Sequence, residues 1–331
     1  MTMIESRVSI VVASYNHCEF LDQRIQSLLS QSYTDFEIII IDDASTDSSP
    51  EVLRRFENHP KVQILELREN MGWVKVSNLG ADMASGEFII FGNCDDYSDP
   101  NQVRELVKAM GKYPTAGLAF SRSNIVDNQG LLHGNDYETR GVRFRRKCRF
   151  DTLISKELMT SYLFHSIVIP NLSAAIFRKS VFNEVGKFSE EIEIAGDWEI
   201  FFRIAERYDV AYLAESLNNF RSHDESIRSH TKVRAMQSDI ARLLLNRIKV
   251  SASSFVKKMF YRHRIIYLLI LVLRKPTKSD LSDCVFLLNF ACKYDPLCIP
   301  VLPVAIMSRV ARVPVGVVAR FFKVFKAKVT Q

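Results

Sequence analysis

A chain of 331 residues is longer than one small module, and its length predicts two domains, or one large domain with an appendage. Its composition, with 47% hydrophobic and 25% charged residues, 12 glycines and 10 prolines, excludes collagen-like, solenoid and largely disordered chains. The net charge of +6 is unevenly divided. From Lys232 onward there are 19 basic and four acidic residues, so this tail is strongly basic and the rest is acidic. Such asymmetry favours a polyanionic partner for the tail, either nucleic acid or an anionic membrane surface.

The six cysteines are scattered along the chain, with no C-x-x-C pair and no His/Cys cluster at zinc spacing. This spacing predicts reduced thiols in a cytosolic compartment. The first residues contain a predicted strand rather than a basic segment followed by a long apolar stretch. We therefore expect no export signal there.

Short β-rich runs alternate with helical periodicity in the first half of the chain. Strands are predicted at residues 8–13, 37–41, 62–67, 87–92 and 116–126. Helices are predicted around residues 21–29, 49–56, 74–83, 103–110 and 197–207. This alternation is typical of an α/β fold, with a parallel sheet and crossover helices.

The basic tail sets the predicted domain boundary near residues 229–233, giving domains 1–230 and 231–331. Its apolar runs are shorter than the roughly 20 residues that span a bilayer. Residues 319–329 (ARFFKVFKAKV) have the pattern of a basic amphipathic helix that lies on a membrane surface. The alternative is a helical subdomain packed on the acidic domain, with its lysines and arginines in solvent.

Polar side chains follow three predicted strands: Ser14-Tyr15-Asn16, Asp42-Asp43 and Asn93 to Asp96. The carboxyl ends of strands are where open α/β sheets bind ligands. No G-x-G-x-x-G follows the first strand and no P-loop motif occurs, which excludes dinucleotide redox and P-loop chemistry. Clustered oxygen donors suggest instead a divalent cation that holds a diphosphate.

Several segments together resemble family 2 glycosyltransferases over about residues 7–228. They are VSIVVASYN, LSQSYTDFEIIIIDDASTDSS, NMGWVKVSNLGADMASGEFIIFGNCDDYSDP, AGDWEIFFRIA and FRSHDES. The resemblance implies a GT-A fold, which is Rossmann-like with a mostly parallel central sheet and flanking helices.

In that family the residues matching Asp43, Ala13 and Tyr15 bind the nucleotide of a nucleotide sugar, and those matching Lys75 and Asn78 contact it as well. An alternative for Asp42 and Asp43 is a turn or a helix cap.

The segment Asn93-Cys94-Asp95-Asp96 matches the D-x-D-D element of the family, with an amide in place of the first acid. The resemblance implies that Asp95 ligates a divalent cation, Mn²⁺ or Mg²⁺, and that Asp96 and Asn93 lie at the donor diphosphate. The missing charge at Asn93 should weaken metal binding, and the alternative for Asp95 is a turn former.

Two further elements complete the resemblance. Arg221, His223 and Ser226 in FRSHDES match the element that closes over the diphosphate, with His223 a candidate metal ligand. Asp197 matches the catalytic base, although Gly196 precedes it where the family commonly has Glu. The alternative for Asp197 is a cap of the following helix.

We therefore expect an inverting glycosyltransferase that uses a UDP- or dTDP-linked sugar and a glycan or polyprenyl-diphosphate acceptor. Such an enzyme would serve cell-surface polysaccharide assembly, of O-antigen or capsule type. The tail suggests a cytoplasmic protein, peripheral at the inner face of the cell membrane. Phe321, Phe322 and Phe325 are spaced as an apolar helical face, which favours membrane over nucleic acid. The alternative is a non-catalytic nucleotide-sugar or nucleic-acid binding protein with a degenerate metal site.

Overall fold

The computed structural model describes residues 6–166, 168–169, 171–192 and 195–222. By its contacts the chain divides into two units, residues 1–229 and 230–331, and every described residue belongs to the first. The predicted amphipathic helix at residues 319–329 therefore lies outside the described residues. So does the rest of the basic tail.

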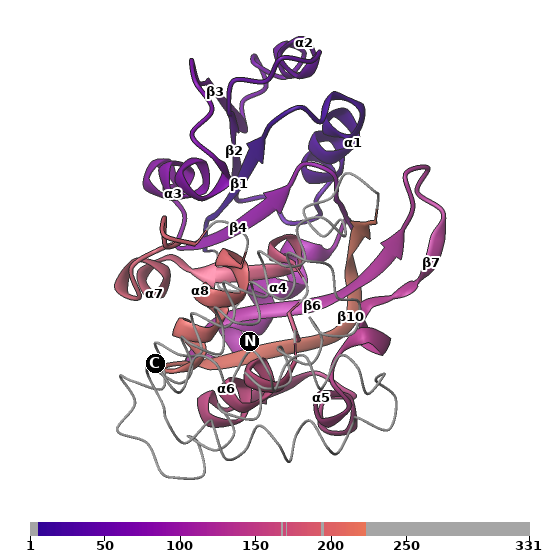
Figure 1. Ribbon diagram of the computed structural model, residues 1–331, viewed down its shortest axis with the longest axis vertical. Coiled ribbons are helices and arrows are strands. Elements are labelled where there is room, and N and C mark those ends of the chain that lie inside the picture. The colour runs from indigo at the N-terminus through magenta and orange to yellow at the C-terminus, as the bar shows by residue number, and fades with distance from the viewer. Residues whose placement is uncertain (1–5, 167, 170, 193–194, 223–331) are drawn as a thin grey trace, which may run out of the picture. The chain divides into compact units, whose positions relative to one another are not determined.

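In the part of the chain that the structure describes, ten strands form one sheet (Figure 1). Its order is β3-β2-β1-β4-β9-β6-β10-β5, with β7 beside β6 and β8 beside β10. The strands are β1 (Val8–Ser14), β2 (Phe36–Asp42), β3 (Val62–Glu66), β4 (Phe88–Asn93), β5 (Tyr97–Ser98), β6 (Ala116–Val126), β7 (Leu132–Asn135), β8 (Thr152–Ile154), β9 (Ala175–Arg178) and β10 (Asp209–Arg221).

Strand direction in the sheet determines where a ligand can bind. The strands β3, β2, β1 and β4 are parallel, while β9 runs antiparallel to both β4 and β6. This arrangement confirms the predicted α/β class. It also brings the carboxyl ends of β1, β2 and β4 to the same edge of the sheet.

Eight α-helices lie among these strands in the described residues. They are α1 (Cys18–Leu29), α2 (Ser49–Arg54), α3 (Trp73–Met83), α4 (Gln102–Lys112), α5 (Val142–Lys147), α6 (Lys156–His165), α7 (Lys179–Glu184) and α8 (Gly196–Ala205). Two single turns of 3₁₀ helix add Asp136–Thr139 and Leu172–Ala174. No helix within the described residues is long and apolar enough to cross a membrane.

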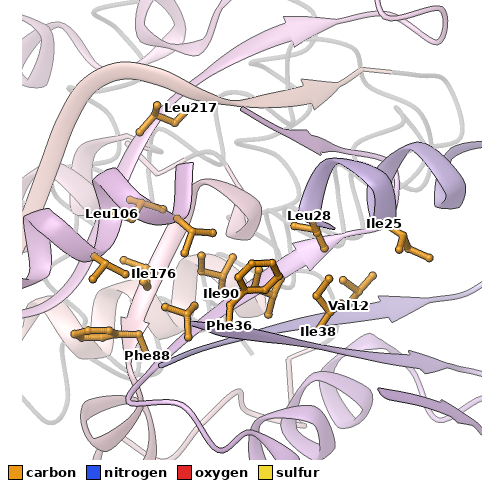
Figure 2. Packing of buried hydrophobic residues seen from close by; sticks show 14 of the residues in the cluster. Val12, Ile25, Leu28, Phe36, Ile38, Phe88, Ile90, Leu106, Ile176 and Leu217 are labelled. Carbon is orange, nitrogen blue, oxygen red and sulfur yellow. The ribbon is translucent and has the colours of Figure 1, made fainter. Parts of the chain in front are cut away.

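The main hydrophobic core lies between one face of the sheet and helices α1, α2 and α4. Figure 2 shows part of it, including Ile25 and Leu28 of α1 and Leu106 of α4. Alternate residues of β1 enter this core, because successive side chains of a strand point to opposite faces. The core residues contributed by β1 and α1 are Val8, Ile10, Val12, Leu21, Ile25 and Leu28. Burying each of these side chains stabilises the fold by about 1.5–3 kcal/mol.

The opposite face of the sheet is covered by α3 and by an aromatic cluster. At Gly80 of α3 a Cβ would lie 2.3 Å from Cγ1 of Val11, so glycine allows the helix to approach β1 closely. Phe91 of β4 packs against Phe177, with ring centroids 5.5 Å apart, and Phe177 stacks on Phe201 of α8 at 5.8 Å. This cluster fixes α8 against the sheet and so positions the residues at the start of α8.

Candidate functional site

The ends of three neighbouring strands bring predicted site residues together. Ala13 near the end of β1 pairs with Asn93 at the end of β4, and Ser14 pairs with Asp42 at the end of β2. The backbone N–H of Asp43 donates to the carbonyl of Ser14 at 2.8 Å. Ala13, Asp43 and Asn93 are therefore neighbours at one edge of the sheet.

The carboxylate of Asp43 is buried and holds the loop that precedes α3. Its Oδ1 accepts a hydrogen bond from the N–H of Met71 at 2.6 Å, and its Oδ2 accepts one from Gly72 at 2.9 Å. Each carboxylate oxygen can accept a second hydrogen bond. Asp43 therefore retains acceptor capacity for further hydrogen bonds.

The two acids at the end of β2 have different contacts. Asp42 accepts hydrogen bonds from the N–H and hydroxyl of Ser45, which is the turn role considered as its alternative. Tyr15, directly after β1, is 43% exposed, so its ring is accessible to a ligand.

A direct contact joins the Asp43 loop to Asp197. Trp73 follows Gly72 and begins α3, and a Cβ on Gly196 would lie 2.9 Å from the indole of Trp73. Gly196 immediately precedes Asp197 in the first turn of α8. The missing side chain at Gly196 thus makes room for Trp73. Segments far apart in sequence, around Asp43 and Asp197, meet through this contact.

The Asn93–Asp96 segment lies beside the same strand ends. The N–H of Asn93 donates to Oγ of Ser173 at 2.9 Å, and its Nδ2 donates to Oδ2 of Asp96 at 3.4 Å. Asp95 is half-buried, whereas Asp96 is only 1% exposed. Burial raises the pKa of the Asp96 carboxyl well above its usual range, and the negative charge of Asp95 adds to the shift.

Arg221 is buried next to the Asn93–Asp96 segment, with a relative exposure of 2%. Its Nε donates to the carbonyl of Asp95 at 2.9 Å, its Nη1 to the carbonyls of Asp127 and Asn128, and its Nη2 to Oε1 of Gln23 at 2.7 Å. Four of its five N–H groups are therefore bound by protein. These contacts indicate that Arg221 positions the backbone of Asp95. The predicted contact of Arg221 with phosphate oxygens stays a prediction.

The remaining predicted residues are Lys75 and Asn78 on α3, together with two residues outside the description. Lys75 is exposed in the first turn of α3. The amide of Asn78 donates to the carbonyl and accepts from the N–H of Phe188, at 2.9 Å and 3.1 Å, so it anchors that loop. Its predicted nucleotide contact has no support in this geometry. His223 and Ser226 lie outside the described residues.

Sequence reasoning missed Arg24, which lies close to the Asn93–Asp96 segment. This arginine is 0% exposed, and its Nη1 donates to Oγ of Ser98 at 3.0 Å. A signal was present in the sequence. Arg24 is a charged residue among Leu21, Ile25 and Leu28 on the buried face of α1.

Asp95 and Asn93 offer oxygen donors of the kind that a divalent cation binds. Among the described residues no group of three or more His, Cys, Asp or Glu side chains is placed to hold a metal ion. A carboxylate from Asp95 and the amide oxygen of Asn93 suit Mg²⁺ or Mn²⁺, which bind through one or two carboxylates plus substrate phosphates. These residues fit a cation held largely by its nucleotide ligand.

The mostly parallel sheet, with acids and amides gathered where β1, β2 and β4 end, defines the GT-A class of fold. Two solved structures share it. S. aureus TarS in complex with UDP-GlcNAc matches with a TM-score of 0.64 at 16% identity, over 88% of this chain and 82% of that one. A mannosyltransferase from Pyrobaculum calidifontis, in complex with GDP-Man and Mn²⁺, matches with a TM-score of 0.58 at 17% identity, over 98% and 81%.

Similarity in sequence identifies the family as well as the fold. A model of glycosyl transferase family 2 matches residues 9–186, which is more than half of the chain, so the chain belongs to that family. It is 26% identical over 247 residues to a chondroitin synthase of Pasteurella multocida. That match covers 74% of this chain but only 24% of the relative.

Proposed function

We propose that the protein is an inverting glycosyltransferase that moves a sugar from a UDP- or dTDP-linked donor to a hydroxyl of a glycan or polyprenyl-diphosphate-linked acceptor. The observation that carries this proposal is the contact between the loop held by Asp43 and the start of α8. Through this contact Asp43, the buried acceptor proposed for a nucleobase, is connected to the segment that carries Asp197.

Asp197 acts as the general base in the proposed reaction. It accepts the proton of the acceptor hydroxyl while that oxygen attacks the anomeric carbon of the donor sugar. The new glycosidic C–O bond forms as the bond between the anomeric carbon and the donor's β-phosphate oxygen breaks. Both electrons of the broken bond leave with the nucleoside diphosphate, and the configuration at the anomeric carbon inverts.

The Asn93–Asp96 segment binds the diphosphate end of the donor. A divalent cation on Asp95 and the amide oxygen of Asn93 would neutralise part of the charge on the leaving diphosphate. Arg221 fixes the backbone of Asp95, because its Nε donates to the Asp95 carbonyl. Positioning of both substrates supplies much of the rate enhancement in such displacements.

The decisive experiment measures UDP release from a panel of UDP-sugars, with and without Mn²⁺, in native protein and in Asp197→Asn. We expect Asp197→Asn to lower the rate by about 10²–10⁴-fold, which is the usual contribution of a general base. Asp22→Asn is the matched control, because Asp22 is half exposed and, among the described residues, pairs with Arg55 at the surface. Equal rates in native protein and Asp197→Asn would overturn the base assignment. Nucleotide binding without any turnover would favour the non-catalytic alternative.

We also propose that the protein is peripheral at the cytoplasmic face of the cell membrane and serves cell-surface polysaccharide assembly. The charge of the tail supports this, and so does an exposed basic patch around α5. This α5 patch consists of Val142, Arg143, Arg146, Lys147, Arg149 and Phe150. Phe150 is 80% exposed and Val142 54%, so the patch combines positive charge with apolar side chains, as membrane-surface segments do.

Vesicle sedimentation of the full chain tests this placement. Native protein should pellet with phosphatidylglycerol vesicles at low salt and less at high salt, because such attraction is screened. Reversal of two charges, Arg143→Glu with Arg146→Glu, should weaken binding about tenfold or more, at roughly 1 kcal/mol per basic residue. The control reverses Arg54 and Arg55, two exposed arginines on and after α2. Equal loss in both double variants would contradict a specific role for the α5 patch.

A further inference from the structure

The guanidinium of Arg24 is buried without enough hydrogen-bond partners. Within the described residues its Nη1 donates to Ser98, whereas its Nε and Nη2 have no hydrogen-bond partner. A buried donor left unsatisfied costs about 1–3 kcal/mol, and more when the group is charged. An apolar side chain of similar size would avoid that cost. Stability of the fold therefore does not explain an arginine at this position.

The guanidinium of Arg24 lies beside the Asn93–Asp96 segment, which is the proposed binding site for the donor diphosphate. At Gly92, one residue before Asn93, a Cβ would lie 2.1 Å from Nη2 of Arg24. At the other end of the segment, Ser98 accepts from Nη1. The guanidinium thus contacts the chain just before and just after residues 93–97. Glycine at position 92 is what leaves space for it.

The charges of this segment act on Arg24. Burial lowers the pKa of its guanidinium, while the negative charges of Asp96 and Asp95 raise it. Arginine stays protonated even in such surroundings. The cation is therefore fully buried and close enough to both acids to interact with them electrostatically.

The combination changes the charge that a diphosphate meets. A segment with the three carboxylates of the D-x-D-D element and no cation would repel a diphosphate and attract a divalent metal ion. Here Asn93 replaces one acid with a neutral amide, and Arg24 adds a fixed positive charge of the kind a metal ion would otherwise supply. Both differences lower the repulsion between segment and diphosphate, and both weaken the attraction for a metal ion.

We propose that Arg24 is a built-in counter-cation of the donor site, a positioning residue whose charge lets the nucleoside diphosphate bind without a divalent cation and lowers the affinity of Asp95 for that cation. This inference rests on the proposed function, since it assigns the donor diphosphate to the Asn93–Asp96 segment. The proposal predicts two opposite changes in affinity. Removal of the Arg24 charge weakens metal-free nucleotide binding and strengthens metal binding.

The experiment compares native protein with Arg24→Met, which removes the charge at similar length, and Arg24→Lys, which keeps it. Arg55→Met is the control for loss of an exposed arginine. Affinity for UDP, and for GDP as a second probe, is measured by calorimetry in EDTA. Affinity for Mn²⁺ alone is measured from the spin-resonance signal of the free ion. Circular dichroism confirms that each variant is folded.

In Arg24→Met we expect UDP affinity in EDTA to fall about five- to tenfold and Mn²⁺ affinity to rise by a similar factor, from one charge at intermediate range in a partly aqueous medium. Arg24→Lys should stay near native values for both. A gain in Mn²⁺ affinity is informative because a damaged site would lose it. Affinities within twofold of native, or a joint fall of both, would overturn the proposal.

Native protein alone gives a second measurement should Arg24→Met fail to fold. Its UDP affinity in EDTA should lie within about tenfold of its affinity in Mn²⁺, and an absolute requirement for Mn²⁺ would overturn the inference. Failure to bind either nucleotide under both conditions would instead remove the proposed donor site, while the Mn²⁺ measurement would still test the charge effect. The two failures are therefore distinguishable.

Discussion

At the scale of single residues, Gly196 and Trp73 depend on each other. The indole of Trp73 occupies the space that a side chain at position 196 would need, and Asp197 is the next residue. Sequence comparison with the family pattern identified Gly196 as unusual. It gave no reason for the glycine, because the reason is a contact with a residue 123 positions away in the chain.

The size of this dependence is measurable. Gly196→Ala in the native background should lower the free energy of unfolding by about 1 kcal/mol, the lower end of overpacking costs. In a Trp73→Leu background the same change should be neutral or stabilising, because alanine is the better helix former by about 1 kcal/mol. Urea denaturation of native protein, the two single variants and the double variant gives the coupling free energy between positions 73 and 196. Equal effects in the two backgrounds would show that the indole does not restrict position 196.

At the scale of elements, one carboxylate ties together the starts of two helices. Asp47 accepts hydrogen bonds from the N–H of Cys18, which begins α1, and from the N–H of Ser49, which begins α2. Partial burial acts to raise the pKa of Asp47, but these hydrogen bonds lower it to about 2. The carboxylate is thus stabilised as the anion, where helix N-termini favour negative charge.

This shift predicts an acid-dependent loss of stability. A pKa lowered on folding adds stability above the unfolded value near pH 4, and that contribution disappears as pH falls towards 2. We expect native protein to lose about 1 kcal/mol more than Asp47→Asn across that interval, less than the full shift implies because the group is partly exposed. Urea titrations at a series of pH values provide the measurement. Parallel pH profiles for the two proteins would contradict the assignment.

Prediction of elements from sequence succeeded where one pattern dominated. The strands β1, β2 and β4 are continuous apolar runs, and α4 shows its buried face at regular helical spacing, so their positions were predicted to within a few residues. Arg24 was missed because periodicity identifies a buried face without saying what a charged member of that face contacts. Its neighbours at Gly92 and Ser98 come together only through the fold.

At the scale of the whole molecule, the sheet is predictable in its first half and less so afterwards. Residues 131–150 form β7, a 3₁₀ turn and α5, which are short elements without their own periodic signal. They are held by a buried ion pair of Arg140 with Asp136 at 2.8 Å, and Arg140 also donates to the carbonyl of Ser121 in β6. The side chains of the pair are 0% and 4% exposed.

Breaking this pair should destabilise the molecule strongly. Asp136→Asn leaves the buried guanidinium without its counter-charge, and we expect a loss of about 3 kcal/mol or more in the free energy of unfolding. Replacing both partners with apolar residues, Asp136→Leu and Arg140→Met, should recover most of that loss. Chemical denaturation distinguishes the cases. A double variant less stable than Asp136→Asn would show that the pair contributes net stability.

The chain holds two tryptophans, and the fold gives them different surroundings. Trp198 is 6% exposed, with its indole N–H donating to the carbonyl of Leu163, whereas Trp73 is partly exposed beside the loop that Asp43 holds. The molecule thus carries an intrinsic optical reporter beside the proposed nucleotide site and a largely shielded reference indole. We expect ligand addition to change mainly the emission of Trp73, so occupancy can be followed without any added dye.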